Sequence, residues 1–181
     1  MTQFQAVTPD IEVNGQTVIA FIAGMEHYQH RALEILERNG IANPRPGEWY
    51  SQQAWLNAFK TIAEEVGPYT LYCIGTKIPE HAQFPDGIDS LESALRSIDI
   101  AYHLNHRGGE IGSYQFHHSP DGTMHFFCDN PYPCEFDRGI IEGMARRFEP
   151  PGRHINVRHD DSAPCRNRGD DSCRYRIELS P

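Results

Sequence analysis

The spacing of apolar residues in the first half of the chain is that of amphipathic helices. One helical stripe, which the Asn39-Gly40 pair would end, comprises Val18, Ile22, Met25, Ala32 and Leu36. The Asn14-Gly15 pair is a hairpin signal, so residues 18–23 could also be a strand, but the helix fits the pattern better. Residues 43–49 form a loop punctuated by proline and glycine.

A second helix is predicted over residues 51–66, where Gly67-Pro68 would end it. Its stripe comprises Trp55, Phe59, Ile62 and Val66. The short apolar segment that follows, TLYCIG, contains Cys73, which we interpret as a small buried hydrophobic residue. A third helix is predicted to begin at the capping pair Asp89 and Glu92 and to end before Gly108. Its stripe comprises Leu91, Leu95, Ile98 and Tyr102.

Beyond Gly109 the apolar period changes to that of strands. A hairpin is predicted by alternation on either side of a Ser-Pro-Asp-Gly turn, with Tyr114, Phe116 and His118 before it and Met124, Phe126 and Cys128 after it. A helix over about residues 135–148 follows, and then a strand with Ile155, Val157 and His159 and another with Cys173, Tyr175, Ile177 and Leu179. The pattern predicts an α+β fold with N-terminal helices packed on a C-terminal four-stranded antiparallel sheet of strand-strand-helix-strand-strand order.

Length and charge narrow the class of protein. The 181 residues suit a single domain, with residues 1–87 mainly helical and residues 88–181 forming a helix plus the sheet. A net charge of -9 argues against nucleic-acid binding, which needs clustered Lys and Arg. No stretch approaches a membrane span, and the first residues lack a signal-peptide pattern, so we expect a cytoplasmic protein. The five cysteines are then expected to be reduced thiols or metal ligands.

Four of the five cysteines cluster late in the chain as Cys128-x5-Cys134 and Cys165-x7-Cys173. The predicted elements place them at strand ends, at a helix start and in a turn, which can meet at one edge of a sheet. Four thiolates that converge are good ligands for zinc, so a structural zinc site is one interpretation. The other is four independent buried or turn cysteines.

The segment Cys165-RNRGDDS-Cys173-RYRI resembles the C-terminal signature of the 4-vinyl reductase domain family, most clearly over residues 88–179. That family belongs to a superfamily with the H-NOX haem domains and small subunits of a vesicle-tethering transport particle. The resemblance implies a sensory module for small hydrophobic molecules. It also implies zinc ligands at Cys165 and Cys173, with Cys134 as the upstream ligand. Ser162 replaces the acidic ligand of the family, so Cys128, His159 or Asp161 must supply the fourth, and we take Cys128 first.

The resemblance to H-NOX domains raises the question of haem. Those relatives bind haem through a histidine on the helix before the sheet, and His103 lies close to that place. Their Tyr-x-Ser-x-Arg stretch, which clamps the haem propionates, has no counterpart in CDNPYPCEF. We therefore expect no stoichiometric haem, with a haem-based gas sensor through His103 as the alternative.

Enzymatic function is the less favoured class. No GxSxG, P-loop or GxGxxG motif occurs, and His117, His118 and His125 fit a solvated surface cluster. Cys134 has no histidine nearby in sequence to act as a base. Reduction of a tetrapyrrole-like substrate remains an alternative, although nothing in the sequence supplies a hydride cofactor site.

These observations favour a non-catalytic ligand-binding or sensory module with a structural metal site. We expect a pocket for a small hydrophobic molecule between the helices and the sheet, lined by Phe59, Tyr102, His103, Tyr114 and Phe116. The module would act through a signalling partner or as a homodimer. The apolar flank of the first helix, with Phe21, Tyr28 and Ile35, is the expected dimer surface.

Overall fold

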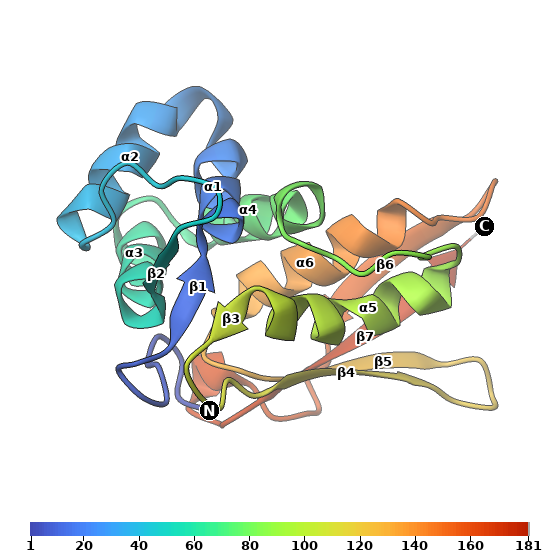
Figure 1. The fold of residues 1–181 in the computed structure, drawn as a ribbon. Helices are drawn as coiled ribbons and strands as arrows, with labels where there is room; N and C mark the ends of the chain where they lie inside the picture. The colour runs from blue at the N-terminus through green and yellow to red at the C-terminus, as the bar shows by residue number, and fades with distance from the viewer. Residues whose placement is uncertain (181) are drawn as a thin grey trace.

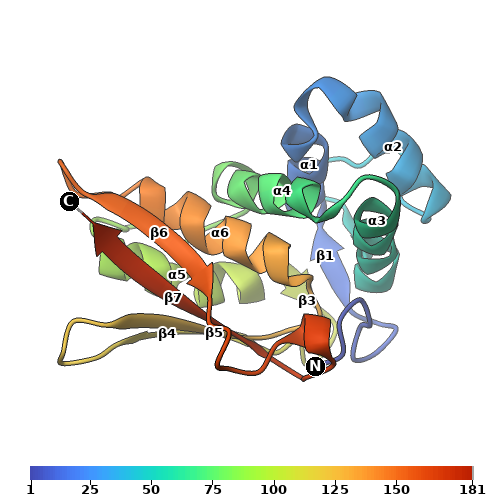
Figure 2. The same cartoon turned by 180° about the vertical axis from the view of Figure 1, so that it is seen from behind.

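The computed structural model describes residues 1–180 (Figures 1 and 2). Its α-helices are α1 (Gly15–Gly24), α2 (Gln29–Arg38), α3 (Gln52–Glu65), α4 (Pro68–His81), α5 (Leu91–Leu104) and α6 (Cys134–Arg146), with short 3-10 helices η1 (Glu26–Tyr28) and η2 (Arg166–Arg168). Its strands are β1 (Glu12–Asn14), β2 (Trp49–Ser51), β3 (His106–Arg107), β4 (Ser113–His118), β5 (Met124–Asp129), β6 (His154–His159) and β7 (Cys173–Ser180). Within residues 1–180, no helix is long and apolar enough to cross a bilayer.

The larger sheet has the strand order β4-β5-β7-β6, and every neighbouring pair is antiparallel. Helices α5 and α6 lie across one face of this sheet, and α4 packs against α6 on the side away from the strands (Figures 1 and 2). The register places Cys128 of β5 opposite Cys173 of β7. The predicted α+β fold and its strand-strand-helix-strand-strand order are confirmed.

A smaller sheet of order β2-β1-β3 was not predicted. Its strands have only two or three residues, too few for a period-2 pattern to show. In this sheet Val13 pairs with His106, directly after the end of α5. The pairing ties the N-terminal segment to α5 and holds His106 inside the molecule.

The first helix is broken where the sequence predicted one continuous stripe. Helix α1 ends at Gly24, and Glu26 has a positive φ of 36°, which a helix cannot continue through. Asn14 caps α1 by accepting a hydrogen bond from the Gln16 N–H, so the Asn-Gly pair starts a helix and makes no hairpin turn. Phe21 and Ile35 are fully buried in the core, so they cannot form the expected dimer surface. Tyr28 is exposed.

The segment around Cys73 is the helix α4, which the sequence analysis described only as a short apolar stretch. Pro68 stands at the start of this helix, where its fixed φ and missing N–H are tolerated. Gly75 lets α4 approach α6 closely, because a Cβ there would lie 2.2 Å from the Phe136 carbonyl oxygen. Cys73 is half-buried on this helix, less covered than the sequence interpretation required.

Two predicted helix starts can be compared with the caps that form. Helix α3 runs as predicted, with the Ser51 hydroxyl accepting from the Ala54 N–H. Helix α5 is capped by Ser90 and Ser93, which form a reciprocal capping box. The predicted Asp89–Glu92 pair does not form this cap; Asp89 instead accepts a hydrogen bond from the Ser93 hydroxyl.

Candidate ligand cavity and metal centre

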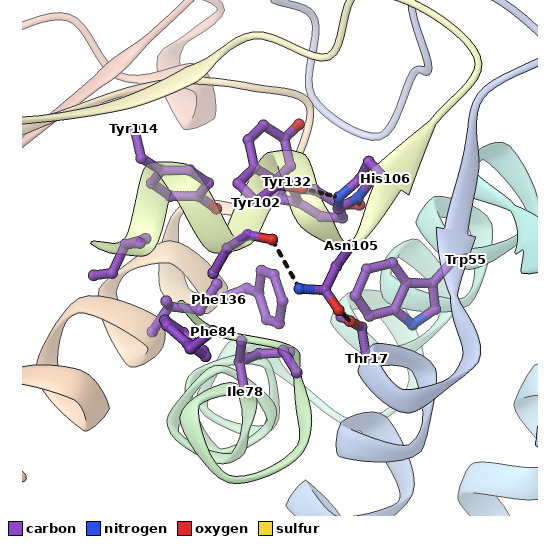
Figure 3. Close-up of a pocket in the computed structure, with 14 residues that line it drawn as sticks. Thr17, Trp55, Ile78, Phe84, Tyr102, Asn105, His106, Tyr114, Tyr132 and Phe136 are labelled. Carbon is purple, nitrogen blue, oxygen red and sulfur yellow. Dashed lines mark hydrogen bonds between the residues drawn. The ribbon is translucent and has the colours of Figure 1, made fainter. Parts of the chain in front are cut away.

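A cavity of about 30 Å³ lies where α5 and β4 face α3, α4 and α6 (Figure 3). Aromatic and aliphatic side chains make up most of its wall, among them Trp55, Ile98, Tyr102, Tyr132 and Phe136. A volume of this size has room for roughly two water molecules. With this packing, the cavity suits a ligand of a few heavy atoms.

The sequence-predicted pocket residues fall into two groups. Tyr102 and Tyr114 line the cavity. Phe59 is buried behind the wall, with its ring 4.6 Å from that of Phe136, and Phe116 lies farther along the sheet under the Arg96 guanidinium. His103 is on the outer side of α5, with its side chain 52% exposed, because the helical turn that brings Tyr102 inward carries the next residue out.

His106 is the histidine that faces the cavity. Its Nδ1 lies 2.8 Å from the Tyr102 carbonyl oxygen, which can only accept, so Nδ1 carries the proton. Its Nε2 then accepts from the Tyr132 hydroxyl at 2.6 Å. Burial lowers the pKa of His106 to about 4, so the imidazole is neutral near pH 7. His106 follows Ile98 and Tyr102 at intervals of four residues, and this spacing is the sequence signal that could have found it, although His106 lies in β3 just beyond the end of α5.

Further polar groups surround the Tyr132 hydroxyl. Gln52 donates to it from Nε2 at 3.3 Å, while Gln52 Oε1 has no hydrogen-bond partner among residues 1–180. Trp55, which lines the cavity, has an indole N–H that is likewise unpaired within that range. Buried polar atoms are normally paired, so the indole N–H of Trp55 is a candidate for a hydrogen bond to a molecule in the cavity.

Three of the four cysteines named from the sequence converge at a second site. The ligand atoms of Cys134, His159, Cys165 and Cys173 all lie within 4.8 Å of one another. The Sγ–Sγ distance is 3.8 Å from Cys134 to Cys165 and 3.2 Å from Cys134 to Cys173. Sulfurs bound tetrahedrally to one zinc lie roughly 3.5 to 4 Å apart, so a small closure or opening would give that geometry.

Cys128 is not part of this cluster. It is buried on β5 opposite Cys173, and burial and the nearby Asp137 raise the pKa of its thiol well above the ordinary value. His159, at the end of β6, takes the fourth place, and Asp161 is outside the group. His159 Nε2 has no hydrogen-bond partner in the described part of the chain, which leaves this nitrogen able to bind a metal.

Hydrogen bonds within the cluster favour a thiolate at Cys173. Cys134 is the first residue of α6, where the positive end of the helix dipole lies. A hydrogen bond from the Cys134 thiol lowers the pKa of Cys173, and the backbone N–H of Arg166 points at the same sulfur from 3.4 Å. Three thiolates and an imidazole form a ligand set that zinc binds in closed structural sites.

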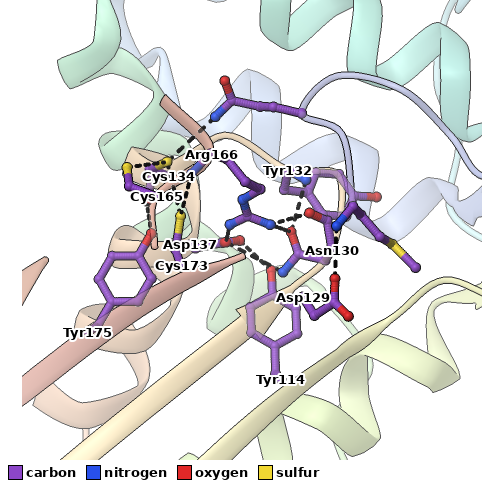
Figure 4. A network of polar contacts seen from close by, with 12 residues as sticks. Tyr114, Asp129, Asn130, Tyr132, Cys134, Asp137, Cys165, Arg166, Cys173 and Tyr175 are labelled. Carbon is purple, nitrogen blue, oxygen red and sulfur yellow. Dashed lines mark hydrogen bonds and ion pairs between the residues drawn. The ribbon is translucent and has the colours of Figure 1, made fainter. Parts of the chain in front are cut away.

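A buried polar network adjoins the cluster (Figure 4). The fully buried Arg166 guanidinium donates to Asp137 and to both the carbonyl and the side-chain oxygen of Asn130. The other oxygen of Asp137 accepts from the Tyr114 hydroxyl at 2.6 Å. Burial raises the pKa of Asp137 to about 6, and Arg166 opposes this. Neither Arg166 nor Asp137 was predicted from the sequence to belong to a site, because charged residues at such positions are usually exposed on the surface.

Comparisons with known proteins identify the fold. No protein-family model matches the chain, and no curated protein matches its sequence. An H-NOX protein from S. oneidensis in the Fe(II)NO ligation state superposes with a TM-score of 0.65 at 16% identity, covering 91% of this chain and 99% of that one. An oxygen-binding H-NOX domain related to soluble guanylate cyclases superposes with a TM-score of 0.63 at 15% identity, covering 93% of this chain and 95% of that one. A structure described in terms of haem redox potential and protein-induced porphyrin distortion superposes with a TM-score of 0.57 at 15% identity, covering 93% of this chain and 99% of that one.

The chain therefore has the fold of the H-NOX domains. The finer assignment to the 4-vinyl reductase family stays a prediction. The expectation of no haem is contradicted, because the solved structures that share this fold include iron and haem-bearing domains. In this chain the donor chemistry fits haem at His106, a neutral imidazole of the cavity wall whose Nε2 is an acceptor bound by the Tyr132 hydroxyl. The cavity is too small for the haem macrocycle while the aromatic side chains of its wall are packed as they are.

Proposed function

We propose that this protein is a sensory module that binds a small uncharged ligand in the cavity between α5 and the helices α3, α4 and α6. The cavity carries the proposal, since it is largely apolar and has one neutral imidazole and tyrosine side chains in its wall. Apolar pockets with a few placed polar groups are the usual small-molecule sites of proteins. The H-NOX fold supports the same reading, since one solved neighbour is described as oxygen-binding.

Xenon, which enters apolar cavities, is a suitable test of the cavity. Under xenon pressure we expect saturable amide shifts in NMR spectra at residues around Ile98 and Tyr114. Ala101→Leu, which places a larger side chain on the cavity wall, should abolish these shifts. Ile100→Leu on the exposed side of the same helix is the matched control and should leave them unchanged. Absence of saturable shifts in the unmodified protein would refute the cavity proposal.

Haem is a second candidate ligand, favoured by the geometry of His106 and by the solved neighbours. A bound haem would supply iron that takes diatomic gases, and His106 is the residue of this chain that would hold it. Nδ1, held by the Tyr102 carbonyl, would fix the ring while Nε2 faced the iron. Binding would require Tyr132 to release Nε2 and the aromatic wall to move.

Reconstitution with haemin tests this candidate. If haem is the ligand, the protein should show a Soret band at one haem per chain. His106→Ala should abolish the band, whereas His103→Ala should retain it because His103 is outside the cavity. Loss of the band in His103→Ala instead would show that the wrong histidine has been assigned.

We also propose one structural zinc held by Cys134, His159, Cys165 and Cys173. The support is the convergence of these four ligand atoms within 4.8 Å, from α6, β6, β7 and the loop between those strands. A closed four-ligand site leaves no position open for catalysis, so the metal would stabilise the fold.

Zinc content distinguishes this ligand set from the one expected from the sequence. The purified protein should contain one zinc per chain by elemental analysis. Cys165→Ser and His159→Ala should lose it, and Cys128→Ser should keep it, because the Cys128 side chain is outside the cluster. If Cys128→Ser loses zinc and His159→Ala retains it, the four-thiolate site is the correct one.

A further inference from the structure

The cysteine cluster and the ligand cavity are joined by continuous buried polar contacts, and Arg166 is at their centre (Figure 4). We propose that Arg166 is a positioning residue for both sites, through which metal binding at the cysteines sets the conformation of the Tyr114 and Tyr132 walls of the cavity. This inference rests on the metal site and the cavity proposed above.

The backbone of Arg166 is bound to the cluster. Arg166 directly follows Cys165, and its N–H lies 3.4 Å from the Cys173 sulfur. The Cys165 N–H in turn donates to the Asp170 carboxylate at 2.8 Å, which closes the turn. Any change in how the two cysteines are held, such as coordination to a metal, therefore moves the start of η2 and Arg166 with it.

The side chain of Arg166 reaches the two tyrosines of the cavity wall through one intermediate each. Through Asp137 it reaches Tyr114, whose hydroxyl donates to the other carboxylate oxygen at 2.6 Å. Through Asn130 it reaches Tyr132, because the oxygen that accepts from the guanidinium also accepts the Tyr132 N–H at 2.9 Å. Both tyrosines line the cavity.

The burial of the Arg166–Asp137 ion pair indicates that the pair has a role besides stabilising the fold. Arg166 and Asp137 are both fully buried, and apolar side chains of the same volume would often be as stable, without the cost of desolvating two charges. A planar guanidinium fixes the direction of its partners in a way that apolar packing does not. The Nε–H of Arg166 has no partner among residues 1–180. The hydrogen bonds of the guanidinium therefore come from its two terminal nitrogens and go to Asp137 and Asn130. The pair transmits position between the two sites.

The buried Trp55 can report on the cavity wall. Its ring lies 5.3 Å from that of Tyr132, and the chain has only one other tryptophan, Trp49. In a Trp49→Phe background labelled with 5-fluorotryptophan, the ¹⁹F resonance of Trp55 is followed while zinc is added to metal-free protein. We expect the resonance to shift until one zinc per chain is bound.

Matched variants test the route. Arg166→Lys keeps the charge but loses the planar guanidinium, and Asn130→Ala removes the oxygen that joins Arg166 to Tyr132. In both, the shift caused by zinc should fall at least twofold while zinc is still bound. Tyr175→Phe is the control, because its hydroxyl bonds to the Cys134 carbonyl beside the metal and reaches no cavity residue. It should keep the full shift.

Each outcome decides a different point. If zinc binds and the Trp55 resonance does not move, the coupling is wrong and the metal site stands. If the shift is undiminished in Arg166→Lys and Asn130→Ala, Arg166 is not the route. If the unmodified protein binds no zinc, the metal site fails and the coupling fails with it.

Discussion

Burial disfavours charge in both the cavity and the cysteine cluster, but only at the cluster do neighbouring groups offset it. In the cavity wall, burial keeps His106 neutral and raises the pKa of Tyr132 above its ordinary value. At the cluster, hydrogen bonds and neighbouring charges keep groups ionised, as with Cys173 and Arg166. A site without charges can be formed by regular elements alone, whereas a buried site with charges needs a partner for each one.

The two regions also differ in which parts of the chain form them. The cavity is lined mainly from helices and from β4, whose inward faces follow simple periods. The cluster takes Cys134 from a helix start, His159 and Cys173 from strand ends, and Cys165 from a loop. The regular face of a helix or strand tolerates substitution at single positions. A metal site built from the ends of helices and strands depends on each of its ligands. The predictions below test this contrast.

Metal removal should have the largest effect. Structural zinc contributes on the order of 10 kcal/mol in small zinc domains, so a chelator should lower the Tm of the zinc-loaded protein more than any substitution considered below. The loop between β6 and β7 should lose amide exchange protection first. Cys73→Ser, outside the cluster, is the control and should respond to chelator as the unmodified protein does. An unchanged Tm would show that the cluster needs no metal.

Asp137→Ala tests the charged region next. It leaves the Arg166 guanidinium buried without its counterion, which costs about 3 to 5 kcal/mol of unfolding free energy. Asp129→Ala, at an exposed carboxylate paired with the N-terminus, should cost under about 1 kcal/mol. Urea unfolding of both variants measures the difference. Equal losses would mean that the Arg166–Asp137 pair is not a dominant interaction.

His106 gives the cavity region its own pH dependence. Its folded-state pKa of about 4 is below the ordinary 6.5, so the unfolded chain binds the proton more readily between these values. The stabilisation is complete above about pH 6.5 and is lost as the pH falls through 4, amounting to about 3 kcal/mol. His106→Gln should remove this part of the pH dependence in urea titrations, and His103→Gln should leave it in place.

Gly75→Ala tests the contact between α4 and α6, with the smallest expected effect. A Cβ at this position would meet the Phe136 carbonyl oxygen, and separating the helices to admit it costs about 1 to 3 kcal/mol. Gly109→Ala, where the nearest atom would be 3.3 Å away, should cost less. A neutral Gly75→Ala would show that the helix packing beside the cavity is looser than the structure indicates.

Local patterns were sufficient for the regular elements of the fold. Apolar spacing alone identified α3 and α5, the hairpin β4–β5, α6 and the two last strands, because each has one buried face of regular period. The cysteine spacing pointed to four neighbouring thiols, of which Cys134, Cys165 and Cys173 lie together and Cys128 does not. These features depend on residues close together in sequence, where helical and strand periods are visible.

Tertiary structure decided the rest, since it depends on contacts between distant segments. The break after Gly24 and the short β2-β1-β3 sheet leave no periodic signal in the sequence. Only the pairing of β6 with β7 brings His159 to the cysteines in place of Cys128. Only the pairing of β1 with β3 holds His106 in the cavity wall while His103 faces outward. A side chain's period along its own element determines that it is buried, but the neighbouring elements determine what it is buried against.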